Sequence, residues 1–81
     1  MADPTTVDDD IRQLLAEQLD FDPLDIKDDS NIVLDLGADS LDIIQLVIAI
    51  EIAYEIEISD RDAEALVTVA DVIGYVQKRI A

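Results

Sequence analysis

The chain has 81 residues, 51% of them hydrophobic, and its 20 acidic side chains against 5 basic ones give a net charge of −15. This length fits one small domain and excludes a second, while the charge makes nucleic acid and anionic membranes poor partners and favours proteins with basic patches. The absence of Cys and His excludes disulfides, thiolate catalysis and cysteine zinc sites, and it removes the commonest general base.

The N-terminus lacks the basic and apolar regions of a signal peptide, and no apolar run reaches the ~20 residues needed to cross a bilayer. We therefore expect a soluble, cytoplasmic protein. The first expected element is an amphipathic helix over residues 6–19, capped by Thr5 or Thr6. Its apolar stripe consists of Val7, Ile11, Leu14, Leu15 and Leu19. Aspartates at 8–10 suit the helix dipole; a metal site is the weaker reading, because consecutive residues on a helix point in different directions.

Residues 20–39 form a connection that is long for a small domain and is punctuated by Pro23 and Gly37. Its apolar side chains are spaced so that they can pin the loop to the core: Phe21, Leu24, Ile26, Ile32, Leu34 and Leu36. Asp28, Asp29 and Asn31 suggest a calcium loop, but the glycine and the closing glutamate that such a loop requires are missing.

The motif at residues 36–42, Leu-Gly-Ala-Asp-Ser-Leu-Asp, lies where this loop becomes a regular element. Ser40 is expected to be the N-cap, because its oxygen can accept a backbone N–H that has no partner inside a helix. A phosphate ester on the same oxygen would also be favoured by free N–H groups and by the helix dipole. Gly37 keeps the approach to the hydroxyl open. Without a histidine base, Ser40 is not expected to be a hydrolytic nucleophile.

Residues 41–54 fit two patterns. Apolar residues alternate with other residues from Ile48 to Ile58, which is typical of a strand, whereas Leu46, Val47, Ile50 and Tyr54 supply the inward stripe of a helix. A single strand would have nothing in this chain to pair with.

Two capping patterns mark the remaining helices. Ser59 followed by Asp62 opens a short helix over residues 60–66, and Thr68 followed by Asp71 opens a last helix over residues 69–80. The apolar stripe of the last helix is Val69, Val72, Ile73, Val76 and Ile80. Lys78 and Arg79 suit its C-terminal end.

The motif at residues 36–41 resembles the attachment motif of acyl carrier proteins, in which the serine carries a phosphopantetheine arm. The resemblance extends from about Val7 to Val76. Matching positions beyond the motif are Asp42, Leu46, Glu51, Tyr54, Ile58, Asp60, Ala63, Thr68, Val69 and Ile73. It favours a helix over residues 40–55 and implies an all-α fold, a small bundle of three longer helices and one short helix.

The resemblance also implies a carrier and not an enzyme. A phosphopantetheinyl transferase would move phosphopantetheine from coenzyme A to the Ser40 hydroxyl, and Asp39 and Leu41 would be cofactor-binding residues beside it. The arm would end in a thiol that holds acyl groups as thioesters. Its partners would be ketosynthases, acyl-transfer enzymes and related enzymes of fatty-acid, specialised lipid or polyketide synthesis, and the carrier is expected to be a monomer.

Two sets of residues are assigned on this basis. The partner-binding face is expected to contain Asp39, Leu41, Asp42, Gln45, Ile48, Glu51 and Ile52. An acyl pocket between the helices is expected to contain Leu46, Val47, Ile50, Tyr54, Ile58, Leu66 and Ile73. Asp39, Asp42 and Glu51 are the first choices for ion pairs with basic enzyme patches, which mainly steer encounter. The alternative is that the apolar side chains after Ser40 only build a tighter core.

The second helix departs from the family in being less acidic. Gln45, Ile52 and Ala53 stand where typical members carry glutamates, and Ile43 stands where a polar residue is common. These departures favour a dedicated partner or a specialised acyl group. Two other functions stay open: a peptidyl or aminoacyl carrier with the same arm, and an unmodified acidic interaction domain with the same fold.

Overall fold

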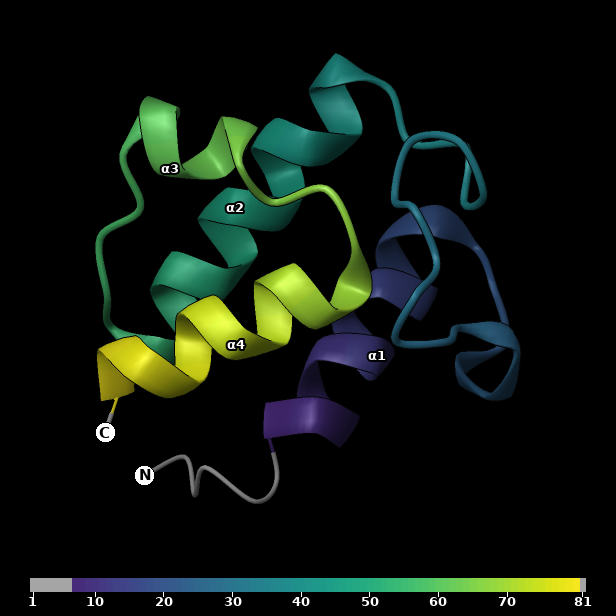
Figure 1. The fold of residues 1–81 in the computed structure, drawn as a ribbon, viewed down its shortest axis with the longest axis horizontal. Helices are drawn as coiled ribbons and strands as arrows, with labels where there is room; N and C mark the ends of the chain where they lie inside the picture. The colour runs from purple at the N-terminus through teal and green to yellow at the C-terminus, as the bar shows by residue number, and fades with distance from the viewer. Residues whose placement is uncertain (1–6, 81) are drawn as a thin grey trace.

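The computed structural model describes residues 7–80, which form four α-helices, one short 3₁₀ helix and no strand. The elements are α1 (Val7–Leu19), η1 (Pro23–Asp25), α2 (Ser40–Tyr54), α3 (Asp60–Glu64) and α4 (Val69–Ile80). α1 packs against both α2 and α4, while the short α3 lies beside α2 on the other side of the bundle (Figure 1). The expected all-α bundle of three longer helices and one short helix is confirmed. The expected caps of α1, Thr5 or Thr6, lie outside the described residues.

The core lies between α1, α2 and α4, as their apolar stripes predict. Its members from the helices are Val7, Ile11, Leu15, Ala16, Leu46, Ile50, Val69, Val72, Ile73 and Val76. α2 contributes only two of these fully buried side chains although it is apolar nearly all round. Much of its apolar surface therefore remains outside the core.

The long loop before α2 is held to the body by some of its apolar side chains and by polar contacts. Ile26, Ile32 and Leu36 are buried, but the prediction is wrong for Phe21, Leu24 and Leu34, which are 37%, 90% and 82% exposed. The Asn31 side-chain oxygen accepts the N–H groups of residues 33 and 34 at 3.0 and 2.9 Å. This turn directs the Leu34 side chain outward.

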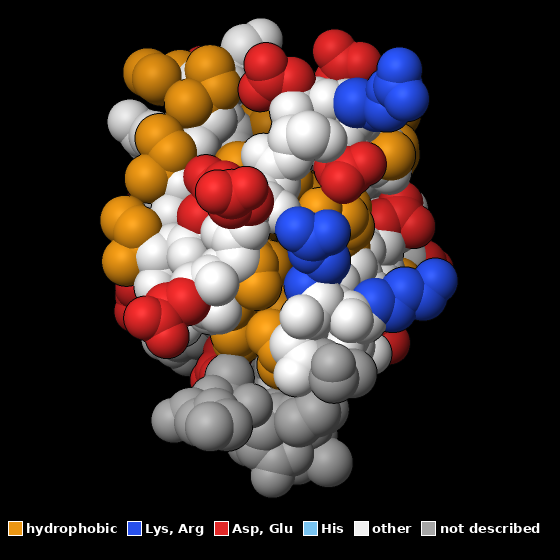
Figure 2. Space-filling model, turned by 90° about the vertical axis from the view of Figure 1, so that its left-hand side faces the viewer, with side chains coloured by type: hydrophobic (Ala, Val, Ile, Leu, Met, Phe, Trp, Pro, Cys, Tyr) orange, Lys and Arg blue, Asp and Glu red, His pale blue; other side chains and the backbone are white. Residues whose placement is uncertain are grey.

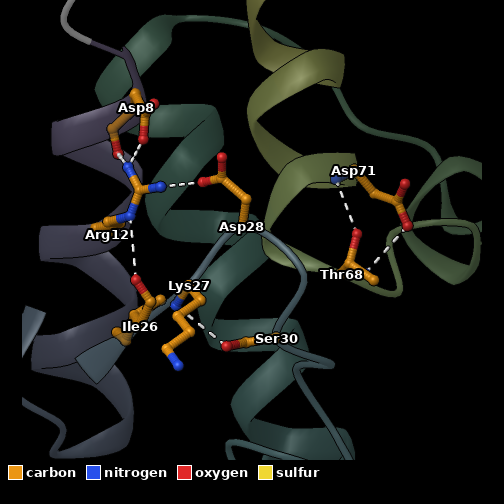
Figure 3. A network of polar contacts seen from close by, with 8 residues as sticks. All are labelled: Asp8, Arg12, Ile26, Lys27, Asp28, Ser30, Thr68 and Asp71. Carbon is orange, nitrogen blue, oxygen red and sulfur yellow. Dashed lines mark hydrogen bonds and ion pairs between the residues drawn. The ribbon is translucent and has the colours of Figure 1, made fainter. Parts of the chain in front are cut away.

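Backbone and ionic contacts join the loop to both α1 and the start of α4. Ser30 accepts the Lys27 N–H at 3.1 Å through its hydroxyl and the Val69 N–H at 3.1 Å through its carbonyl. Arg12 of α1 pairs with Asp8 and Asp28 and donates from Nε to the Ile26 carbonyl at 3.2 Å (Figure 3). The position of the loop that leads into α2 is thus set from two sides.

Capping explains where the later helices begin and end. Ser59 caps α3, accepting the Asp62 N–H at 3.1 Å, and Thr68 accepts the Asp71 N–H at 3.2 Å at the start of α4. α3 ends at Glu64, short of the expected residue 66, because the next N–H groups bond to carbonyls three residues back and tighten the turn. No helix within residues 7–80 is long and apolar enough to span a membrane.

Candidate functional site

The N-terminus of α2 is capped by Asp39, so the prediction that Ser40 is the N-cap is wrong. Asp39 has an extended backbone (φ −100°, ψ −175°), and its carboxylate accepts the Asp42 N–H at 2.9 Å. The Asp42 carboxylate accepts the Asp39 N–H at 3.1 Å in return. This reciprocal pair competes with a serine cap and leaves Ser40 as the first residue inside the helix.

Ser40 consequently presents an uncommitted hydroxyl to solvent. The side chain is exposed, and within residues 7–80 its hydroxyl makes no hydrogen bond. The backbone N–H groups of Ser40 and Leu41 likewise have no partner among the described residues, as expected for the first turn of a helix. Gly37 turns the chain toward this site with φ of 73°, and a Cβ there would meet no atom within 4 Å. Glycine is therefore needed at this turn for its left-handed backbone.

An apolar groove opens beside the Ser40 hydroxyl. Its volume is about 480 Å³, and it lies between the first turns of α2 and the helix α3. The lining residues are Ser40, Ile43, Ile44, Asp60, Ala63 and Glu64. We call this the Ser40 groove. A second groove of about 330 Å³ runs from α3 toward Leu34 and Val67 and shares Ile43, Ala63 and Glu64 with it.

The residues expected to line an acyl pocket are gathered mainly in the core. Leu46, Ile50, Ile58 and Ile73 are buried, and Val47, Tyr54 and Leu66 pack against them. Of this set, Leu66 lines the second groove, whereas Tyr54 lies at the opposite end of α2. Neither Ile43 nor Ala63 was in the set expected to line the acyl pocket, although Ile43 was among the apolar residues after Ser40 for which a pocket role was open, and Ala63 was missed. The apolar residue at position 43, where the family commonly has a polar one, was the available signal for the first of them.

Part of the expected partner face forms a continuous apolar stripe along α2. Leu41, Ile48 and Ile52 are 60%, 48% and 74% exposed, and Ile44, which was not expected on this face, is 55% exposed. The spacing of three and four residues puts all four on one side of the helix, beginning next to Ser40. Figure 2 shows hydrophobic side chains running down one margin of the molecule, apart from the basic side chains.

The polar members of the expected face make contacts within the molecule. Asp39 and Asp42 form the capping pair, and Gln45 accepts a hydrogen bond from the Gln18 amide of α1. Glu51 is half-buried, and its carboxylate accepts the Ile58 N–H at 2.9 Å. The roles expected for these residues in partner binding stay predictions. Glu51 already has an internal function, which is to hold the loop after α2.

Comparison with known proteins identifies the family of this arrangement. The family described as "Phosphopantetheine attachment site" matches residues 9–76, which include Ser40 and both grooves. The chain belongs to the acyl carrier proteins. It is 50% identical over 70 residues to the acyl carrier protein of Campylobacter curvus, covering 86% of this chain and 91% of that one. Identity to the acyl carrier protein of Wolinella succinogenes is 48% over 69 residues, covering 85% and 91%.

The fold comparison agrees. The structure of the acyl carrier protein from Enterococcus faecalis superposes with a TM-score of 0.83 at 28% identity, covering 96% of this chain and 99% of that one. Members of this family bind phosphopantetheine and interact with biosynthetic enzymes as carriers, not as catalysts. The expected family and cofactor are thus confirmed.

Proposed function

We propose that this chain carries acyl groups as thioesters on a phosphopantetheine arm esterified to the Ser40 hydroxyl, and delivers them to enzymes of fatty-acid, specialised lipid or polyketide synthesis. The observation that carries the proposal is the exposed hydroxyl of Ser40, which Asp39 frees by capping α2. Unpaired N–H groups of the first turn favour a phosphodiester at this position.

The residues around Ser40 fit such an arm. When bound, phosphopantetheine supplies the thiol that a chain without cysteine lacks. The Ser40 groove, about 480 Å³ in volume, offers the side chains of Ile43, Ile44 and Ala63 to an apolar cargo and excludes water from one side of it. Ser40 has no base within hydrogen-bonding reach among residues 7–80, so the partner enzymes supply the chemistry.

The exposed stripe of α2 supports a dedicated partner. Its four residues, Leu41, Ile44, Ile48 and Ile52, are large, apolar and solvent-exposed, a combination that marks interaction surfaces. Ile52 stands where typical members of the family carry a glutamate, so this position cannot form an ion pair with a basic enzyme surface. A partner for this carrier therefore offers an apolar strip beside its basic patch, and the carboxylates at 39 and 42 orient the approach.

Incubation with coenzyme A and a promiscuous phosphopantetheinyl transferase tests the attachment. Intact mass is expected to rise by one phosphopantetheinyl group in the wild type and to stay unchanged in Ser40→Ala. Thr68→Ala is a matched control that loses a hydroxyl from another helix start and is expected to be modified. No gain in the wild type would favour an unmodified interaction domain, and a gain in Ser40→Ala would place the arm elsewhere.

Cargo separates an acyl carrier from a peptidyl or aminoacyl carrier. Mass spectrometry of the protein purified from its native host, before and after thioester cleavage, reports what the arm holds. Acyl masses are expected. Amino-acid masses released by the cleavage would instead support the peptidyl alternative.

A further inference from the structure

One wall of the Ser40 groove is formed by α3, which depends on contacts with the rest of the molecule for its stability. α3 has five residues, and a helix this short is unstable in isolation. Its Ala63 faces the groove and packs against the core only in part. Contacts from outside α3 must therefore hold this wall in place.

Tyr75 of α4 contacts α3 directly, and both Tyr75 and Arg79 of α4 contact Glu57 in the connection that leads into α3. The Tyr75 hydroxyl donates to the Asp62 carboxylate of α3 at 2.8 Å and lies 3.5 Å from the Glu57 carbonyl oxygen. Arg79 donates to the same Glu57 carbonyl at 2.8 Å, and its guanidinium carbon lies 5.6 Å from the centre of the Tyr75 ring. The cation over the ring helps to fix the tyrosine in this position.

The Asp62 carboxylate is available because the capping pattern at α3 is only half formed. The Asp62 N–H donates to Ser59, but the Asp62 carboxylate turns to Tyr75 and does not complete a reciprocal cap as the one of Asp42 does. Burial, and next the Asp62 hydrogen bond, raise the pKa of Tyr75. A tyrosine with an ordinary pKa is already protonated at physiological pH, so the hydroxyl has a proton to donate to Asp62.

We infer that Tyr75 is a positioning residue: by its hydrogen bond to Asp62 it holds α3 as the wall of the Ser40 groove and so controls how well the groove shelters what Ser40 carries. The statement about shelter rests on the proposed function, whereas the statement about α3 does not. Tyr75 does not line the groove. It acts through α3, because Asp62, to which it donates, is followed directly by Ala63, which lines the groove.

Hydrogen exchange of the unmodified protein tests the hold on α3. Tyr75→Phe keeps the ring and removes the hydroxyl, and it is expected to speed exchange of the Ala63 and Leu66 amides by about 5- to 10-fold. Asp62→Ala is expected to have the same effect. Asp62→Asn retains a carbonyl acceptor and is expected to restore exchange to near the wild-type rate.

Tyr54→Phe is the matched control, because it removes another tyrosine hydroxyl, one that donates to Asp10 of α1 at 3.3 Å, away from α3. The α3 amides are expected to keep their wild-type rates in it. Unchanged α3 rates in Tyr75→Phe would overturn the inference. An equal acceleration in both tyrosine variants would also overturn it, because it would reflect general destabilisation.

A second measurement tests shelter. Wild type and Tyr75→Phe are loaded with an octanoyl-phosphopantetheine arm by the transferase, and cleavage of the thioester by hydroxylamine is followed by mass. Cleavage is expected to be at least about 2-fold faster in the variant, since groove opening is the exposing step. Equal cleavage would overturn the shelter role. Failure of the wild type to gain the arm at Ser40 would defeat the proposed function and leave the exchange result standing.

Discussion

The carboxylate of Asp39 caps α2 and so leaves the Ser40 hydroxyl without a hydrogen bond to the helix. Because Asp39 and Asp42 satisfy each other's backbone N–H groups, α2 begins without using the serine oxygen. A serine that capped the helix would have its oxygen hydrogen-bonded to the first turn and turned away from solvent. Asp39 therefore has a structural role at the start of α2, besides the partner-binding role that we propose for it.

Asp39→Ala is expected to lower the free energy of unfolding by about 1 kcal/mol, because the N-cap acceptor is lost. Urea denaturation measures the change. Asp39→Asn is the control: it removes the same negative charge and keeps an acceptor oxygen, so it should stay close to the wild type. If the alanine variant were as stable as the asparagine variant, the capping role would be refuted.

Tyr54 is expected to make the free energy of unfolding depend on pH in the alkaline range. Burial first, then the charge of Asp10 and the hydrogen bond to it, raise the pKa of Tyr54 from 10.0 to about 12. The folded state thus favours the neutral phenol, and its contribution is complete below pH 10 and is lost as pH rises toward 12. Urea midpoints measured across this range should fall more steeply for the wild type than for Tyr54→Phe. Parallel curves would contradict the assignment; Tyr75 is present in both proteins and cancels.

At the scale of the element, α2 combines two functions that its residue spacing alone does not separate. Ile50 is fully buried, and Ile52, two residues on, is 74% exposed on the stripe beside Ser40. One helix therefore supplies both the core and an exposed apolar stripe, which we propose as a surface for partners. An isoleucine on the buried side of α2 stabilises the fold, whereas an isoleucine on the exposed side contributes little to stability.

Ile50→Ala and Ile52→Ala test this division with identical chemistry. The first is expected to cost about 2–5 kcal/mol of unfolding free energy, and the milder Ile50→Val about 0.5–1.5 kcal/mol if the alanine variant fails to fold. Ile52→Ala is expected to cost under about 0.5 kcal/mol, because its side chain is already in water. Comparable losses in Ile50→Val and Ile52→Ala in urea unfolding would contradict the assignment of the two faces.

Ile52→Glu tests the partner chemistry of the stripe. Assayed with a ketosynthase of general fatty-acid synthesis, the acyl-loaded wild type is expected to turn over poorly, and the variant is expected to improve by at least about 3-fold, because a carboxylate aids encounter with a basic patch. Gln13→Glu on α1 serves as a control for net charge, because it adds the same single negative charge at an exposed position outside the stripe. Efficient turnover by the wild type, unaffected by Ile52→Glu, would remove the case for a dedicated partner.

The whole molecule carries far more negative charge than its ion pairs neutralise. With a net charge of −15, the close ion pairs within residues 7–80 are those of Arg12 with Asp8 and Asp28. No group of three acidic side chains in the described part of the chain is arranged to hold a metal ion. Repulsion is therefore a property of the entire surface, and its relief should depend on ionic strength.

Added salt or magnesium is accordingly expected to raise the melting temperature. An increase of about 5 °C between 10 mM and 200 mM NaCl is expected, since the Debye length falls from about 30 Å to under 10 Å. Magnesium is expected to act at lower concentration by screening the loop carboxylates of Asp28, Asp29, Asp35 and Asp39. Thermal unfolding followed by circular dichroism measures the shift. Insensitivity to both salts would show that repulsion does not limit stability.

Local patterns were sufficient for much of the architecture. The apolar stripes of α1 and α4, the caps at Ser59 and Thr68, and the motif around Ser40 each involve residues within one or two turns of one another, so the residue order alone carries the information. The 40–55 helix needed the family resemblance. Because α2 is apolar on nearly every side, alternation from Ile48 to Ile58 fits a strand equally well, and only packing against α1 distinguishes the two.

The sequence by itself determined the family, the helical bundle, the charge and the serine at the start of α2. The tertiary structure decided which oxygen caps that helix, which loop side chains are buried, that Ile43 and Ala63 line the groove, and that Glu51 and Tyr75 hold the connection to α3. The physical reason is that these outcomes depend on competition between groups far apart in the chain. Tyr75 and Asp62, or Glu51 and Ile58, become neighbours only after the helices have packed.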